Sequence, residues 1–260
     1  PQGDGGNLKF AVKINVYGKD GLSMEDRMMR TAGSMAIFIP TDFHTDEIRE
    51  KATSIVTKGD TVIPEGVIES WDISEKQNGS VIAYIEDDGT DSGTYKVTIG
   101  GEGKIIANTD MSYYFAGFEN CTTIDLSYLD TSFTTNMSDM FAVSPITRAT
   151  MKVKQIIFSD FFNTSQVTNM NEMFYGCTDL EGIDLSSFDT SKVETMTRMF
   201  HSCRALTKLD LTNFDTSNVT ETLQMFDYCN NLTEIRVKRD KWTIPSSAIS
   251  NSGVTDFTYI

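Results

Sequence analysis

The chain has 260 residues, of which 39% are hydrophobic, and its 37 Asp and Glu residues outnumber its 22 Lys and Arg residues, giving a net charge of −15. A chain of this length can bury a sizeable core, and we expect two structural units. The acidic balance argues against binding to nucleic acid or anionic lipid, because both need a basic face. No apolar run approaches the roughly 18–20 residues of a membrane span, so we expect no direct membrane insertion.

The N-terminal part predicts a β-rich unit. Residues 1–7 lack a basic and then apolar leader, and we expect a flexible tether there; if the native protein is exported, its signal has been removed. In residues 8–17 apolar side chains occupy every second position, as in a half-buried strand. Hydroxyl side chains that can cap a helix, followed by acidic residues, predict helices over 23–30 and 45–56. We therefore expect a small domain over 8–107 that caps the remainder of the chain. Its other predicted strands are 35–40, 62–73, 80–86 and 94–99.

Regularly spaced phenylalanines show that the rest of the chain is a repeat array. Successive members are separated by 26, 33, 26 and 26 residues, so one period is kept once seven extra residues are allowed in the second interval. A fixed period of 20–50 residues is typical of stacked repeats. The five phenylalanines are Phe115, Phe141, Phe174, Phe200 and Phe226.

Each repeat unit has three parts. Leu206, Leu209 and Leu211 have the L-x-x-L-x-L spacing of a short strand whose last two leucines point to one side. The Asp-Thr-Ser triplet at 189–191 predicts a bend, because these side chains bond to nearby backbone amides. Apolar residues at offsets of three and four within 193–200 predict a helix of about two turns.

These parts predict an α/β repeat fold, a leucine-rich-repeat-like solenoid with one strand and one short helix in each 26-residue unit. The solenoid is expected over 108–241. Trp242 and the final apolar segment 254–260 should cover its last coil, so that 242–260 forms a C-terminal cap.

The repeat also resembles a known family. Residues 188–219, FDTSKVETMTRMFHSCRALTKLDLTNFDTSNV, resemble the 26-residue repeat of bacterial surface proteins related to the BspA-like leucine-rich-repeat surface proteins of gut, oral and mycoplasmal bacteria. The resemblance covers roughly 108–240, and residues 71–115 are similar to the segment that often leads into such repeats. It implies a secreted or cell-surface protein with a role in adhesion.

Catalytic and metal-binding motifs are not evident in the sequence. The two histidines, His44 and His201, stand in no recognisable motif, and His201 is expected to be an exposed loop residue. The loop 87–93 is a weak calcium candidate that does not match an EF-hand. We therefore expect no enzyme activity, no cofactor and no metal site. The four cysteines are expected to be buried free thiols: Cys121, Cys177, Cys203 and Cys229.

Acidic side chains recur at one position of the strands and should point outward. Two interpretations are open. The acids could form a solvated ladder that nearby Lys208 satisfies, or an anionic strip that attracts a cationic partner. Arg236 takes the same position in the last coil, where it would act as an electrostatic cap. The recurring acids are Asp125, Asp184 and Asp210.

The segment 143–155 interrupts an otherwise regular coil, and insertions in repeat arrays often map to loops on the binding face. We therefore expect partner contacts from its basic residues Arg148, Lys152 and Lys154 together with the three recurring aspartates. The partner would be a host extracellular-matrix or cell-surface protein or a glycan. The alternative is a structural stalk or spacer without a ligand of its own; a glycan hydrolase would need a carboxylate pair in a cleft, which no motif singles out.

Overall fold

The computed structural model describes residues 28–29, 42–90, 93–143, 149–249 and 251–260. The predicted tether and the elements predicted over 8–17 and 35–40 lie outside these residues. Of the helix predicted over 23–30, only Met28 and Met29 are described, and both form isolated β-bridges, to Ile106 and Ser74 respectively.

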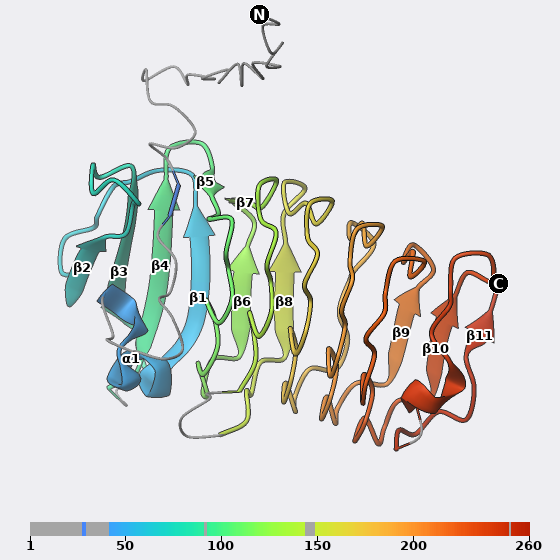
Figure 1. Cartoon of the computed structure of the whole chain (residues 1–260). Helices are drawn as coiled ribbons and strands as arrows, with labels where there is room; N and C mark the ends of the chain where they lie inside the picture. The colour runs from blue at the N-terminus through green and yellow to red at the C-terminus, as the bar shows by residue number, and fades with distance from the viewer. Residues whose placement is uncertain (1–27, 30–41, 91–92, 144–148, 250) are drawn as a thin grey trace, which may run out of the picture.

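The described elements follow one another from the N-terminal sheet to the stacked coils (Figure 1). They are η2 (Asp42–His44), α1 (Asp46–Lys51), β1 (Ala52–Lys58), β2 (Glu69–Asp72), β3 (Val81–Asp87), β4 (Tyr95–Gly101), β5 (Ile105–Ile106), β6 (Thr123–Leu126), β7 (Leu129–Asp130), β8 (Gln155–Phe158), β9 (Lys208–Leu211), β10 (Glu234–Val237), η3 (Ser246–Ile249) and β11 (Thr258–Tyr259).

The helix predicted over 45–56 is only half right. Thr45 caps α1, since its Oγ1 accepts a hydrogen bond from the Ile48 backbone N–H at 3.3 Å. The helix then ends at Lys51, and the following seven residues form β1, which pairs with β4 and β6. The β1 sequence is rich in β-branched residues, and pairing on both edges satisfies its backbone groups as a helix would.

A mixed six-stranded sheet joins the N-terminal segment to the first repeats. Its order is β2-β3-β4-β1-β6-β8, with antiparallel pairing over β2-β3-β4 and parallel pairing from β4 to β8. The predicted hairpin of 80–86 and 94–99 is confirmed as β3 and β4, and the strand predicted over 62–73 is shortened to β2. Because β1 pairs with β6, the N-terminal strands cover the edge of the first repeat. The division of the chain into domains stays a prediction.

The repeats stack as successive coils that pair in two rows. We call the first the strand row: it contains the pairs β6–β8 and β9–β10, with the unpaired segment 182–185 between them. The second, the bridge row, consists of single parallel β-bridges from coil to coil. Its members are Asp110, Asn136, Asn169, Thr195 and Glu221.

The strand-plus-helix solenoid is wrong. Helix α1 is the only α-helix in the described part of the chain, and residues 193–200 form the bridge row and turns instead. The N–H groups of Met196, Arg198 and Phe200 donate to carbonyls of the next coil, not to carbonyls four residues earlier. Arg198 also has a φ of +54°, which a right-handed helix cannot accommodate. Turns that return apolar side chains to the core every three or four residues produced the helical pattern.

An aromatic column runs through the core. The rings of Phe115, Phe141, Phe174, Phe200 and Phe226 stack from coil to coil with centroids 5.4–5.7 Å apart. The four cysteines are free and buried, as predicted. At the C-terminal end, Trp242 and Phe257 pack with centroids 5.1 Å apart and are buried, in agreement with the predicted apolar cover.

Candidate functional site

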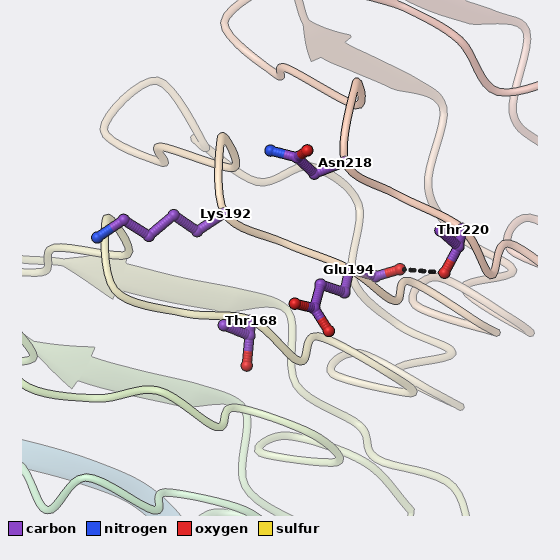
Figure 2. A pocket seen from close by; sticks show the side chains of 5 residues that line it. All are labelled: Thr168, Lys192, Glu194, Asn218 and Thr220. Carbon is purple, nitrogen blue, oxygen red and sulfur yellow. Dashed lines mark hydrogen bonds between the residues drawn. The ribbon is translucent and has the colours of Figure 1, made fainter.

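A hollow on the bridge-row side is the first candidate site, and we call it the ladder groove. Its volume is about 490 Å³, and its lining comes from three successive coils (Figure 2). The lining residues are Thr168 on one coil, Lys192 and Glu194 on the next, and Asn218 and Thr220 on the third.

The backbone fixes the spacing of these side chains. The Glu194 N–H donates to the Thr168 carbonyl at 2.9 Å, and the Thr220 N–H donates to the Glu194 carbonyl at 2.8 Å. The Thr220 hydroxyl donates to the same carbonyl at 3.2 Å, the bond drawn in Figure 2. Because Val167 and Val193 are buried, the residues that follow them point outward and form a polar row across the coils.

The groove presents both hydrogen-bond donors and hydrogen-bond acceptors. Lys192 Nζ donates to Gln166 Oε1 at 2.8 Å, and Asn218 Nδ2 donates to the Ser191 carbonyl at 2.6 Å. The Glu194 carboxylate has no hydrogen-bond or ion-pair partner among the residues that the structure describes. Such a surface can hold hydroxyl, amide or ammonium groups of a ligand.

A second hollow of about 670 Å³ continues toward the C-terminal end and shares Thr220 with the groove. Its lining adds Leu223, which is 66% exposed, and Glu221. The polar surface thus extends over a further coil and gains one apolar contact point.

The histidines lie outside both hollows. His44 is buried, and its Nε2 lies 3.0 Å from the Tyr114 carbonyl oxygen. His201 was expected to be exposed, and this is wrong: it is 9% exposed and lies between the rings of Tyr175 and Tyr228, at 4.9 and 5.2 Å. Its burial lowers its pKa. The sequence could not show this, because the two tyrosines come from neighbouring coils.

The acidic and sulfur side chains of the described residues do not cluster as metal ligands do. Among them, no group of three or more His, Cys, Asp or Glu side chains is placed to hold a metal ion. The calcium candidate at 87–93 falls partly outside the described ranges. Its Asp88 carboxylate accepts hydrogen bonds from the hydroxyls of Thr53, Thr90 and Thr94. These bonds lower the pKa of Asp88 to about 2, and the bonds from Thr90 and Thr94 contribute most.

The three recurring aspartates lie on the strand row, outside the ladder groove. Each accepts a hydrogen bond from the backbone N–H two residues later, at 2.9–3.1 Å, and so closes the turn that follows its strand. The ladder is not continuous, because β8 places Ile157 beside Asp125. Asp184 and Asp210 are exposed, as predicted, and Asp125 is partly buried.

The predicted charge pairing is half confirmed. Arg236 Nη1 lies 3.0 Å from Asp210 Oδ2, so the arginine caps the ladder as expected. Lys208 pairs with Glu234 at 3.4 Å and not with the aspartates, so its predicted role is wrong.

The basic residues of the insertion are not near the groove. Arg148 lies outside the described residues. Lys152 Nζ donates to Asn120 Oδ1 at 2.8 Å, and the Lys154 N–H donates to the Thr122 carbonyl at 2.9 Å. Both lysines therefore contact the residues that directly precede β6. Partner contacts by these lysines and the aspartates stay a prediction.

Sequence reasoning missed the groove residues. Thr168, Glu194 and Thr220 are separated by 26 residues each, so the repeat could have grouped them. The wrong assignment of helix to this part of the unit concealed that their side chains share one face.

Comparison with known protein families gives a match for part of the chain. Residues 146–253 match a family model described as a Mycoplasma protein of unknown function, DUF285. No curated protein and no solved structure matches the chain. The matched segment contains the ladder groove and the regular 26-residue repeats.

Proposed function

We propose that the chain is a non-enzymatic binding protein, secreted or held at the bacterial cell surface, that recognises a macromolecule of a host or a neighbouring cell. The ladder groove is the observation that carries this proposal. Its volume lies within the range of about 300–1,000 Å³ that is usual for binding sites, and its polar groups are held by backbone pairing between coils.

The chemistry of the groove supports binding more than catalysis. A glycan hydrolase needs two carboxylates that flank the bond to be cleaved, and the groove lining contains one, Glu194. A nucleophile would need a base beside it, and neither histidine lines the groove.

The surface location rests on the family match and the resemblance. The match to a Mycoplasma family model is compatible with the surface-protein repeat that the sequence resembles. Among the described residues, no helix combines the length and apolar character that crossing a bilayer requires. The partner class proposed is an extracellular-matrix or cell-surface protein or a glycan.

The alternative function is a spacer. The regular aromatic column, with ring centroids 5.4–5.7 Å apart over five coils, supports it, because such stacking makes a stiff rod whether or not a ligand binds. The groove favours recognition, because a spacer has no need of a polar hollow that spans three coils.

The test is binding to immobilised matrix proteins and glycans by the parent chain, by Glu194→Arg and by Glu65→Arg as control. Glu65 is exposed in the loop between β1 and β2, and its substitution changes the charge equally. We expect saturable binding that Glu194→Arg weakens at least tenfold and Glu65→Arg leaves unchanged. No saturable binding to any ligand, or equal effects of both variants, would contradict the proposal. Deleting 143–155 is a poorer test, since its Met151 and Val153 are fully buried.

A further inference from the structure

The strand row is interrupted between β8 and β9. Strand β8 ends the six-stranded sheet, and β9 begins a separate three-stranded sheet. The segment 182–185 lies between them and is drawn without an arrow in Figure 1. Within the described chain, no backbone hydrogen bond joins 155–160 to 182–187. The same holds between 182–187 and 208–213, so segment 182–185 and the facing edges of β8 and β9 lack the backbone pairing that joins β6 to β8 and β9 to β10.

One extra residue accompanies the interruption. Thr131 and Thr164 make the same hydrogen bonds to the next coil and are 33 residues apart, whereas the strand partners Thr123 and Gln155 are 32 apart. The coil of β8 thus has one more residue between strand and bend, within 159–161. An added residue in one of two neighbouring coils shifts the chain locally, as a bulge does. The regular 26-residue step from Ile183 to Leu209 is unpaired as well, so the extra residue shapes the gap beside β8 and does not account for the second gap.

The interruption opens a hollow of about 370 Å³, which we call the sheet-break cleft. Its lining includes two carboxylates, Asp160 and Asp184, and no Lys, Arg or His. Ile157 and Ile183 are half-buried in its lining. A Cβ added at Gly182 would meet no atom within 4 Å, so there is free space beside this wall of the cleft.

Charge selects the class of ligand that fits. Asp160 is exposed and has no ion-pair partner in the described ranges, and Asp184 uses one oxygen for the Ser186 N–H. Two carboxylates in a chain of net charge −15 repel anions and attract cations.

We propose that the sheet-break cleft docks an extended, lysine- or arginine-bearing segment of a partner protein. The cationic head lies between Asp160 and Asp184, and the aliphatic stem lies against Ile157, which holds the strand position that Asp125 holds on β6. The main chain of the segment runs over the mouth of the cleft, because the two coils are held one strand spacing apart beside it, with the Phe162 and Phe188 rings 5.6 Å apart, and leave no room for a further strand between them. The cleft volume admits one or two side chains and not a folded domain, which is why the occupant is an extended segment.

The cleft lies on the strand row and the ladder groove on the bridge-row side, so the two can be tested separately. The probe is a labelled nine-residue peptide of alternating lysine and threonine, with the glutamate and threonine peptide for comparison. Affinity is measured by fluorescence anisotropy at about 150 mM salt, where long-range attraction between exposed charges is largely screened.

Two variants test the cleft, and one tests the background. Asp160→Asn with Asp184→Asn removes both charges and keeps the bond to Ser186, because an asparagine oxygen also accepts it. Gly182→Leu fills the open wall without altering charge. Glu65→Gln with Asp240→Asn removes the same charge at exposed positions outside the cleft lining.

We expect saturable binding of the lysine peptide, no binding of the glutamate peptide, and a loss of about tenfold or more in both cleft variants. The background variant and Glu194→Arg should change the affinity less than twofold. Three results would overturn the proposal: no saturable binding, equal losses in the cleft and background variants, or unchanged affinity in Gly182→Leu. Thermal melts establish that each variant is folded. Loss of matrix binding in Glu194→Arg alone would bear on the ladder groove and not on the cleft.

Discussion

A buried threonine in each bend clamps one coil to the next, and Thr190 allows this clamp to be tested. The Thr190 hydroxyl donates to the Asp215 carbonyl at 2.9 Å and accepts from the Asp215 N–H at 2.8 Å, and Thr190 is fully buried. Thr131 and Thr164 make equivalent pairs of bonds, and the Thr216 hydroxyl donates to the Lys241 carbonyl and accepts from the Thr243 N–H. Thr190→Val keeps the shape of the side chain and removes both bonds.

The expected loss of stability follows from the count of bonds. A neutral hydrogen bond contributes about 1 kcal/mol net, and a buried donor or acceptor left without a partner costs about 1–3 kcal/mol. Thr190→Val leaves one donor and one acceptor of Asp215 without their partner, at about 1–3 kcal/mol each. Because Asp215 is only half-buried, we expect a decrease in the lower part of the summed range, about 2–4 kcal/mol, in the free energy of unfolding. Thr190→Ser keeps the hydroxyl and loses one methyl group, which costs about 1 kcal/mol.

The assay is equilibrium unfolding in urea, followed by far-ultraviolet circular dichroism and by the fluorescence of Trp71 and Trp242. Coincident transitions would license a single free energy for each variant. If Thr190→Val were no less stable than Thr190→Ser, the hydroxyl bonds between coils would not stabilise the stack, and the clamp would be refuted.

Three further predictions concern the core and the ionisable groups. Phe174→Ala should destabilise the protein by about 3–5 kcal/mol in the same assay, because it opens a cavity in the middle of the aromatic column; a loss below about 1 kcal/mol would contradict the packing. Burial raises the pKa of all four cysteine thiols, so none should react with a thiol reagent until urea unfolds the chain, and rapid labelling of the native protein would refute their burial. Burial raises the pKa of Asp139 from 3.8 to about 7, against a hydrogen bond from Tyr113 that lowers it. A carboxyl whose pKa is raised by folding stabilises the protein fully below its unfolded pKa and loses this contribution as the pH rises through about 7. Asp139→Asn should therefore flatten the dependence of the free energy of unfolding on pH between about pH 4 and pH 7. An unchanged pH dependence would contradict the assignment.

The packing inside the repeats was predictable because it depends only on the position of each residue within the 26-residue period. Phe174 and Phe200 recur at one period, and in a stacked array equivalent residues must meet. The Asp-Thr-Ser bend was predicted as well: Asp189 Oδ1 accepts from the Ser191 N–H at 2.9 Å, which closes the turn. The pattern could not show that the threonine between them bonds to a different coil.

The secondary structure between bends was mispredicted for a physical reason. Apolar offsets of three and four indicate only that a side chain returns to the core at that spacing, and a helix is one of several backbones that do this. Here Arg198 and the residues equivalent to it in other coils adopt a positive φ, and their neighbours donate to the next coil. The side chains of that row, Glu194 among them, therefore face solvent as a ladder and not as the outer face of a helix.

The two parts of the 33-residue interval have unequal consequences for the surface. Six of its seven extra residues precede β8, where Met151 forms a β-bridge with Cys177. The seventh follows β8, within 159–161, and at this point the strand row breaks. In a β-strand, a shift of the register by one residue exchanges the inner and outer faces. A loop, by contrast, can lengthen by several residues at little cost in free energy. The single extra residue after β8 lies where the chain lines the sheet-break cleft, which is why the cleft beside Asp160 is the place where we look for a partner.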